Sequence, residues 1–141
     1  MNEIISFLDY VPLEIINLIF DDLNLNDLLH LASTNIWLMN HIRTTKWRNI
    51  CVRINKNINN VNHIVTTYKF IKYDFSYSQI TDESVKLLGN CHTLYLYGCT
   101  NITDESVKLL GNCHTLNLYR CTKITDESVK FLRNLGVEIY R

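Results

Sequence analysis

The chain has 141 residues, of which 47 % are hydrophobic, and its 14 lysine and arginine residues balance 14 aspartate and glutamate residues. This is the composition of a globular protein that is long enough for one ordinary domain or two very small ones. A net charge of zero gives no argument for a nucleic-acid partner or for an acidic membrane surface.

Three further features concern the compartment. No run of about 18 apolar residues occurs, so we expect no membrane span. The first residues, MNE, lack the basic segment that opens a signal peptide. The five cysteines are odd in number, which does not suit a disulfide framework. We therefore expect an intracellular protein, cytoplasmic or nuclear, with reduced thiols.

The first fifty residues have the periodicity of short helices. Four apolar residues recur at the i, i+3, i+4 and i+7 spacing of an amphipathic helix: Ile16, Ile19, Phe20 and Leu23. Pro12 fits the first turn of this helix, where its missing N–H costs nothing. We expect Asn26 to cap a second helix, which residues 33–35 end. Two more short helical pieces are expected around Trp37 with Ile42 and around Trp47 with Ile50.

So short a helical segment is too small to bury a good core by itself. A module that leaves its apolar faces unsatisfied is a candidate for docking on a partner. The same helices could instead cap the open end of the repeats that follow, since terminal repeats need such caps. The pattern of apolar residues leaves both interpretations open.

The sequence of this segment resembles an F-box. The resemblance is carried by VPLEIINLIFDDL at residues 11–23, by LNDLLHLA at residues 25–32, and by Trp37 and Trp47, and it covers roughly residues 8–50. It departs from the family in three places. Val11 stands where the family has Leu, Asn35 stands where it often has Cys or Ser, and Trp37 comes one residue early.

F-box proteins are the substrate receptors of cullin–RING ubiquitin ligases, and their F-box docks on a small SKP-type adaptor. The resemblance implies an F-box-like helical module over residues 5–51. It also implies that this module binds the adaptor through apolar residues, some of which must face the internal core instead: Pro12, Ile15, Ile16, Ile19, Phe20, Leu23, Leu28 and Leu31.

Residues 52–70 are interpreted as a linker or a degenerate repeat, and residues 71–141 as repeats. Residues 79–100 read QITDESVKLLGNCHTLYLYGCT, residues 101–122 read NITDESVKLLGNCHTLNLYRCT, and residues 123–135 begin again as KITDESVKFLRNL. Thr81, Thr103 and Thr125 fix the period at 22 residues. A fixed period of this size predicts a solenoid, in which each unit buries its apolar face against its neighbours.

Each repeat reads as a strand, a turn and a helix. Thr81 is a good N-cap, and the carboxylates after it lie where the helix dipole favours negative charge. Val85 and Leu88 share one helical face, with Leu87 beside them. Gly89 or Asn90 can end the helix in a left-handed conformation. Residues 94–97, LYLY, alternate with the period of a strand.

Strands are also expected before and after the clear repeats. Ile71, Tyr73 and Phe75 alternate like a degenerate first strand, and Val137 and Ile139 like a closing strand. The sequence therefore predicts a mixed α/β fold, in which a helical module precedes a short solenoid with a parallel sheet on its concave face and helices outside.

The repeats resemble the cysteine-containing class of leucine-rich repeats. The pattern C-x-x-L-x-L-x-x-C-x-x-I-T-D runs from Cys91 to Asp104 and recurs from Cys113 to Asp126. The usual repeat of this family is about four residues longer, within a range of about 20–29. An F-box followed by such repeats is a known family architecture, in which the repeats hold a substrate protein for the ligase.

The repeat cysteines have two interpretations. Cys91, Cys99, Cys113 and Cys121 lie at intervals of 8, 14 and 8 residues, whereas structural zinc sites use tight pairs. The alternative places Cys99 and Cys121 in a ladder of small buried side chains that bond to the backbone. A nucleophilic cysteine is not expected, because the adjacent His92 and His114 would point to the opposite side of an extended segment.

Substrate contact, on this hypothesis, uses outward side chains of the strands: Tyr95, Tyr97, Asn117, Tyr119 and Tyr140. Tyrosine offers rigid, amphipathic contact area of the kind enriched at interface hot spots. The alternative is that the rings only pack on one another along the sheet.

The sequence contains no paired carboxylates, phosphate loop or triad that would indicate an enzyme, so we expect no catalytic residue, cofactor or metal. The expected partners are an SKP-type adaptor with its cullin ubiquitin ligase, and an unknown substrate protein. The main alternative is a structural or decoy protein that uses its repeats to occupy a partner without ubiquitin machinery. A zinc-binding regulatory domain is a third and more remote alternative.

Overall fold

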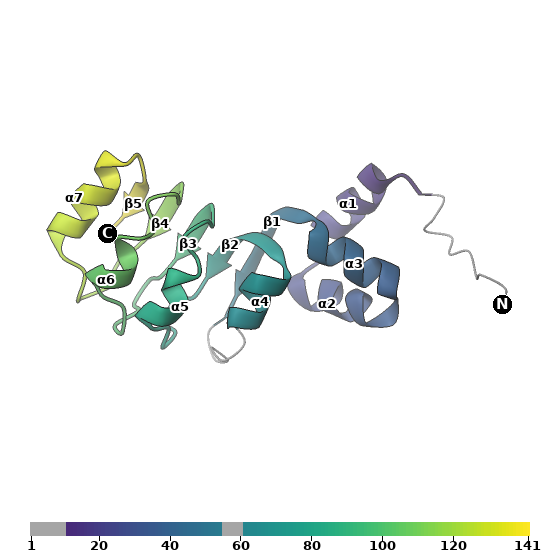
Figure 1. Cartoon of the computed structure of the whole chain (residues 1–141), viewed down its shortest axis with the longest axis horizontal. Helices are drawn as coiled ribbons and strands as arrows, with labels where there is room; N and C mark the ends of the chain where they lie inside the picture. Colours follow the sequence, from purple (N-terminus) through teal and green to yellow (C-terminus); the bar gives the residue numbers. More distant parts are fainter. Residues whose placement is uncertain (1–10, 55–60) are drawn as a thin grey trace.

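The computed structural model describes residues 11–54 and 61–141, and within them the chain has a mixed α/β fold with one parallel sheet. The expected helical module begins at residue 5 and the expected linker includes residues 55–60, so those parts lie outside the described residues. The sheet has five strands in sequence order: β1 (Lys46–Arg53), β2 (Lys69–Asp74), β3 (Thr93–Tyr95), β4 (Thr115–Asn117) and β5 (Glu138–Tyr140). Figure 1 shows these strands following one another along the long axis.

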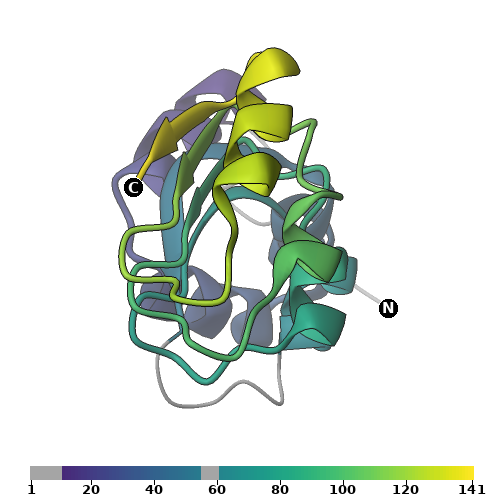
Figure 2. The same ribbon diagram turned by 90° about the vertical axis from the view of Figure 1, so that its left-hand side faces the viewer.

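Short helices connect successive strands, as parallel pairing requires. They are α4 (Val61–Thr67), α5 (Asp82–Lys86), α6 (Asp104–Val107) and α7 (Asp126–Asn134). All four lie on one side of the sheet, which leaves the other side open (Figure 2). Thr81, Thr103 and Thr125 occupy the N-cap positions of α5, α6 and α7, as the sequence predicts.

The N-terminal helices gather beyond β1 (Figure 1). They are α1 (Leu13–Asp21), α2 (Leu25–Thr34) and α3 (Ile36–Thr44). The carbonyl of Pro12 accepts the first backbone hydrogen bonds of α1. Asn24 caps α2 by accepting from the backbone N–H of Asp27 at 3.1 Å, so the expectation that Asn26 is the cap was wrong. Asn35 ends α2 and caps α3.

The prediction of a helical piece around Trp47 and Ile50 was also wrong, because these residues lie in strand β1. β1 pairs with β2 in parallel, with Trp47 opposite Phe70 and Val52 opposite Tyr73. The indole Nε1 of Trp47 donates to the carbonyl of Ile42 at 2.9 Å. The sheet therefore starts at residue 46, inside the segment expected to be purely helical, and the boundary expected at residues 51 and 52 falls within a strand.

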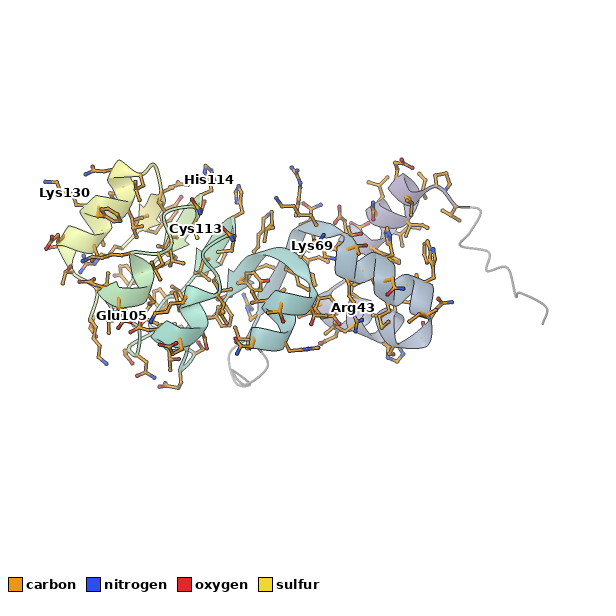
Figure 3. The ribbon with its side chains drawn as sticks, viewed as in Figure 1. Arg43, Lys69, Glu105, Cys113, His114 and Lys130 are labelled. Carbon is orange, nitrogen blue, oxygen red and sulfur yellow. The ribbon has the colours of Figure 1, made fainter. Side chains whose placement is uncertain are left out.

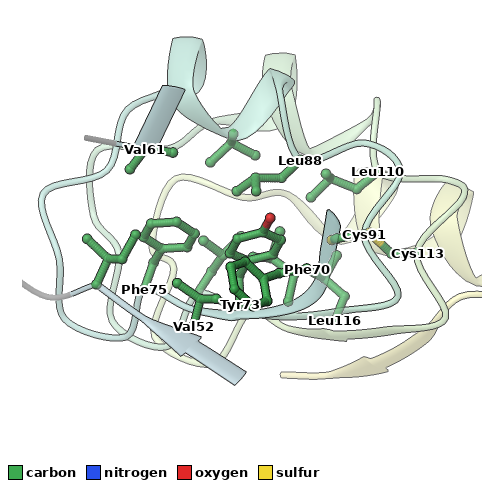
Figure 4. Packing of buried hydrophobic residues seen from close by; sticks show 14 of the residues in the cluster. Val52, Val61, Phe70, Tyr73, Phe75, Leu88, Cys91, Leu110, Cys113 and Leu116 are labelled. Carbon is green, nitrogen blue, oxygen red and sulfur yellow. The ribbon is translucent and has the colours of Figure 1, made fainter. Parts of the chain in front are cut away.

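In the repeats, the core consists of side chains at equivalent positions, stacked strand upon strand. One column lies in register across all five strands: Val52, Tyr73, Leu94, Leu116 and Ile139. On the helix side, Val85, Val107 and Val129 are all buried, as are Leu88, Leu110 and Leu132. Figure 4 shows this packing between the sheet and the helices. Val85 and Leu88 thus face the core as predicted, whereas Leu87 is exposed.

Three left-handed residues follow strands β2, β3 and β4: Tyr77, Gly98 and Arg120 have φ values of 58°, 69° and 61°. Gly89 and Asn90 are not among the positive-φ residues, so the prediction of a left-handed helix end at these positions was wrong. Gly136, which follows the end of α7, does have a positive φ of 90°. The backbone N–H groups of Tyr77 and Gly98 donate to Tyr97 and Tyr119 carbonyls of the next unit, at 2.7 and 2.8 Å, so this backbone geometry links consecutive units.

Candidate functional site

Helix α1 has two apolar faces. Ile16 and Phe20, which are 1 % and 5 % exposed, face inward, and the ring of Phe20 lies 6.0 Å from that of Trp47. Ile15, Leu18 and Ile19 lie on the opposite face and are 46 %, 64 % and 54 % exposed. We call these three residues the α1 stripe. A helix with apolar residues on both sides can pack on its own protein and still present an apolar surface.

The residues expected to bind an adaptor divide between core and surface. Ile16, Phe20 and Leu28 are buried in the core, so they are the members that face inward. Leu23 and Leu31 are half-buried against that core. Pro12, Ile15 and Ile19 remain exposed. Sequence reasoning missed three exposed apolar residues: Leu13, Leu18 and Ile36. Leu18 follows Ile15 by three residues, and this helical spacing could have identified Leu18 from the sequence.

Polar contacts fix α1 on the neighbouring elements. The side-chain Nδ2 of Asn49 in β1 donates to Asp21 Oδ2 at 3.0 Å. Asn17 Oδ1 lies 2.9 Å from Nε2 of His41 in α3, and burial lowers the pKa of His41. The N-terminal helices therefore cover the β1 end of the sheet while the α1 stripe stays uncovered.

The residues expected to hold a substrate lie along the open side of the sheet. Tyr95, Asn117 and Tyr140 are paired in register on β3, β4 and β5. Tyr97 and Tyr119 follow β3 and β4. Tyr95, Tyr119 and Tyr140 are exposed, whereas Tyr97 and Asn117 are half-buried. The structure thus brings all five residues to one side.

Three rings form a continuous row that we call the tyrosine row: Tyr77, Tyr97 and Tyr119. The centroids of Tyr77 and Tyr97 are 4.8 Å apart in an edge-to-face contact, and those of Tyr97 and Tyr119 are 5.3 Å apart and stacked. The guanidinium of Arg120 lies 5.7 Å from the Tyr97 centroid and 5.9 Å from that of Tyr119. The rings therefore pack on one another and also leave aromatic surface exposed.

A hollow of about 420 Å³ adjoins the tyrosine row. It is lined by Arg53, Asp74, Ser76, Tyr77, Tyr97 and Asn117. Arg53 Nε donates to Asp74 Oδ2 at 2.8 Å, and the backbone N–H of Ser76 donates to Asp74 Oδ1 at 2.9 Å. Desolvation opposes ionisation of Asp74, but these hydrogen bonds prevail and lower its pKa.

Sequence reasoning missed five residues of this surface: Arg53, Asp74, Ser76, Tyr77 and Arg120. Repeat alignment could have found Asp74, because it occupies the strand position of Tyr95. Arg120 stands where the preceding unit has Gly98, and this change between near-identical repeats was a usable signal.

The thiols of Cys99 and Cys121 bond to the backbone of the preceding unit. Cys99 Sγ donates to the Phe75 carbonyl at 3.2 Å, and Cys121 Sγ donates to the Leu96 carbonyl at 3.0 Å. These are the contacts that the ladder interpretation predicts. Within residues 11–54 and 61–141, no three His, Cys, Asp or Glu side chains are grouped so that they could hold a metal ion.

The Cys-His pairs just before β3 and β4 point their two side chains to opposite sides of the chain. Cys91 and Cys113 are buried, whereas His92 and His114 are exposed, with their ring centroids 4.7 Å apart. Cys113 and His114 are labelled in Figure 3. Neither His92 nor His114 is therefore directed at its neighbouring thiol to activate it as a nucleophile.

In the described part of the chain, no helix combines the length and the hydropathy needed to cross a membrane. No protein-family model matches the chain, and no curated protein matches its sequence.

Proposed function

We propose that this chain is a substrate-recognition adaptor of an SKP–cullin–F-box type ubiquitin ligase. In this proposal α1–α3 form an F-box-like module that docks on the SKP-type adaptor. The strands and helices after them form a short leucine-rich-repeat solenoid that holds a substrate protein. The chain itself does no chemistry. The observation that carries the proposal is the exposed α1 stripe on a helix whose other face is already packed.

The α1 stripe suits recognition of a helix by an apolar groove. Ile15, Leu18 and Ile19 have the i, i+3, i+4 spacing of anchors in that binding mode. Complete burial of one such side chain contributes about 1.5–3 kcal/mol. These three residues are still 46–64 % exposed, so a partner that covers them gains part of this energy without any need for α1 to refold.

The open side of the sheet supports the second half of the proposal. Successive units add exposed or half-exposed tyrosines to one surface, and these are hot-spot residues in many interfaces. Stacking fixes Tyr97 and Tyr119 against each other, so their ordering on binding costs little entropy. The hollow beside Tyr97 offers a paired Arg53 and Asp74 for polar contacts with a substrate.

Co-purification with an SKP-type adaptor tests the docking half. The Leu18→Asp, Ile19→Asp double variant places two charges in the proposed interface, and we expect it to weaken the one-to-one complex at least about 100-fold. The matched control is Leu109→Asp, Leu135→Asp, since those leucines are 55 % and 54 % exposed but lie in the repeats. Folded wild-type protein that binds no adaptor would rule out the ubiquitin-ligase role.

Capture of a substrate tests the other half. Tyr97→Ala with Tyr119→Ala removes two rings of the tyrosine row, and we expect weaker capture with adaptor binding unchanged. The Leu109→Asp, Leu135→Asp variant again serves as the control, because its changes lie on the helix side. Unchanged substrate capture by the tyrosine variant would contradict the assigned surface.

The alternative is a structural or decoy protein whose N-terminal helices only cap the sheet. It is favoured by one observation, the packing of Phe20 and Asp21 on Trp47 and Asn49 of β1. A decoy binds an adaptor or a substrate without causing ubiquitin transfer. Reconstituted ubiquitination of a captured substrate therefore separates it from the proposed function.

A further inference from the structure

We propose that Cys91 and Cys113 are a redox modification site, at which hydrogen peroxide converts two thiols into a reversible disulfide between neighbouring repeats. Their Sγ atoms lie 3.3 Å apart in the core, and the two residues are 5 % and 4 % exposed (Figure 4). This inference does not rest on the proposed function.

The backbone already holds this pair at a separation that suits a disulfide. Each cysteine comes two residues before its strand, and β3 and β4 pair in register from Thr93 with Thr115. Neighbouring strands are about 4.8 Å apart, and Cα separations of about 4.4–6.8 Å are usual in disulfides. Bond formation therefore needs only a small approach of the two sulfur atoms, with no change of strand register.

The other cysteine pair is a control within the same molecule. Cys99 and Cys121 are also buried, on the same two repeats and 22 residues apart. Their thiols, however, donate to the carbonyls of Phe75 and Leu96 in the preceding units. The two pairs have the same sequence spacing. A difference in their reactivity would therefore result from the direction in which the thiols point.

A hollow borders the pair on the side of Cys91, and Cys113 lies behind Cys91 with the two Sγ atoms 3.3 Å apart. Cys91 lines a hollow of about 340 Å³ that also borders Tyr68, Lys69 and Tyr73. The hydrogen bond from Cys91 lowers the pKa of Cys113, and the same bond together with burial raises the pKa of Cys91. Cys113 is therefore the thiol that ionises first, and the thiolate is the form that reacts with peroxide.

The chemistry balances with peroxide as the oxidant. The Cys113 thiolate attacks one peroxide oxygen, the O–O bond breaks, and a sulfenic acid and one water form after proton uptake. The sulfur of Cys91 then attacks the sulfenic sulfur, its proton passes to the departing hydroxide, and a second water leaves. Two thiols are oxidised and one peroxide is reduced to two waters. In a reducing compartment such a bond is transient and is cleaved by cellular thiols.

The test uses the full chain with Cys51→Ser, which removes the exposed thiol. The folded protein is treated with hydrogen peroxide, free thiols are alkylated after unfolding, and the protein is cleaved after lysine and arginine. A bond between Cys91 and Cys113 joins peptide 87–108 to peptide 109–120, whereas a bond between Cys99 and Cys121 joins peptide 87–108 to peptide 121–123. Fragmentation locates the alkylated cysteine in peptide 87–108.

We expect the first product, with a mass loss of about 2 Da that dithiothreitol reverses. We also expect the oxidised chain to melt about 5–10 °C higher, because the bond closes a loop in the unfolded chain. Cys121→Ala should keep the product and Cys91→Ala should lose it. A predominant bond between Cys99 and Cys121, or sulfinic acid without any bond, would overturn the proposal, and neither result depends on whether the alanine variants fold.

Discussion

The carboxylate of Asp82 accepts hydrogen bonds from both the backbone N–H and the hydroxyl of Thr103, at 2.8 and 2.7 Å, although the two residues are 21 positions apart. The hydroxyl of Ser106 donates to the same carboxylate. Asp104 repeats the contact with Thr125 at 2.9 and 2.7 Å. The recurring ITDES therefore links consecutive helices, and Asp126, the last carboxylate of the series, pairs with Arg141.

Asp82→Asn should lower the free energy of unfolding by about 1–2 kcal/mol, because charge-assisted hydrogen bonds to three donors are weakened. Urea denaturation measures this change. The control is Glu83→Gln at the next position, whose carboxylate is highly exposed and pairs with Lys86 at 3.1 Å. That surface pair contributes little, so the control should change stability by less than about 0.5 kcal/mol. Equal effects of both variants would contradict the linking role of Asp82.

Stability should fall in acid through the same carboxylates. Desolvation raises the pKa values of Asp82 and Asp104, but hydrogen bonds from threonine and serine outweigh it and lower both below the ordinary value. A lowered folded-state pKa gives stability that is present above the unfolded value of about 3.9 and is lost as the pH falls through the folded value.

Melting temperatures at pH 7, 4.5 and 3 measure this dependence. We expect a small loss from pH 7 to 4.5, because burial lowers the pKa of His41 and so opposes its protonation in the folded state, and a clear further drop by pH 3. Asp82→Asn should reduce the drop, because the variant no longer has this titrating group. An equally steep drop in the variant would show that other groups, such as Asp74 beside Arg53, dominate the acid response.

Gly98→Ala should be more destabilising than Gly136→Ala. Both glycines have positive φ, of 69° and 90°, so each substitution carries the backbone cost of a left-handed alanine, about 1–2 kcal/mol. A Cβ at Gly98 would also lie 2.9 Å from the ring of Tyr77, whereas one at Gly136 would meet nothing within 4 Å. The difference between the two unfolding free energies measures this contact. No difference would mean that the Tyr77 ring moves freely out of the tyrosine row.

The repeats could be predicted from the sequence because their pattern is local and each unit packs against a near copy of itself. Leu94 and Leu96 alternate with exposed or half-buried tyrosines, and Val85 and Leu88 share a helical face. The burial of one unit therefore predicts that of the next. Even here the left-handed helix end predicted at Gly89 or Asn90 was wrong, because the left-handed residues Tyr77 and Gly98 lie after the strands, where their N–H groups bond to carbonyls of the next unit.

Strand β1 could not be predicted, because its partner lies in β2. Its pairing shifts register between Trp47 and Cys51, so buried residues fall at positions 47, 50 and 52. A gap of three residues between Trp47 and Ile50 resembles helical spacing, and this caused the incorrect helix assignment. Pairing with β2, which the local pattern does not contain, makes this segment a strand.

The candidate sites likewise include features that were predictable from the sequence and features that were not. The 22-residue period, the N-cap positions of the repeat threonines and the outward tyrosines could be predicted from the sequence, because these features depend on contacts within a unit or between near-identical units. The sequence could not show which apolar residues of α1 face Trp47 and which form the α1 stripe, because the helix is apolar on both sides and its orientation depends on packing against β1. Only the tertiary structure separated Cys91 with Cys113 from Cys99 with Cys121, because thiol direction depends on packing that equal spacing does not encode.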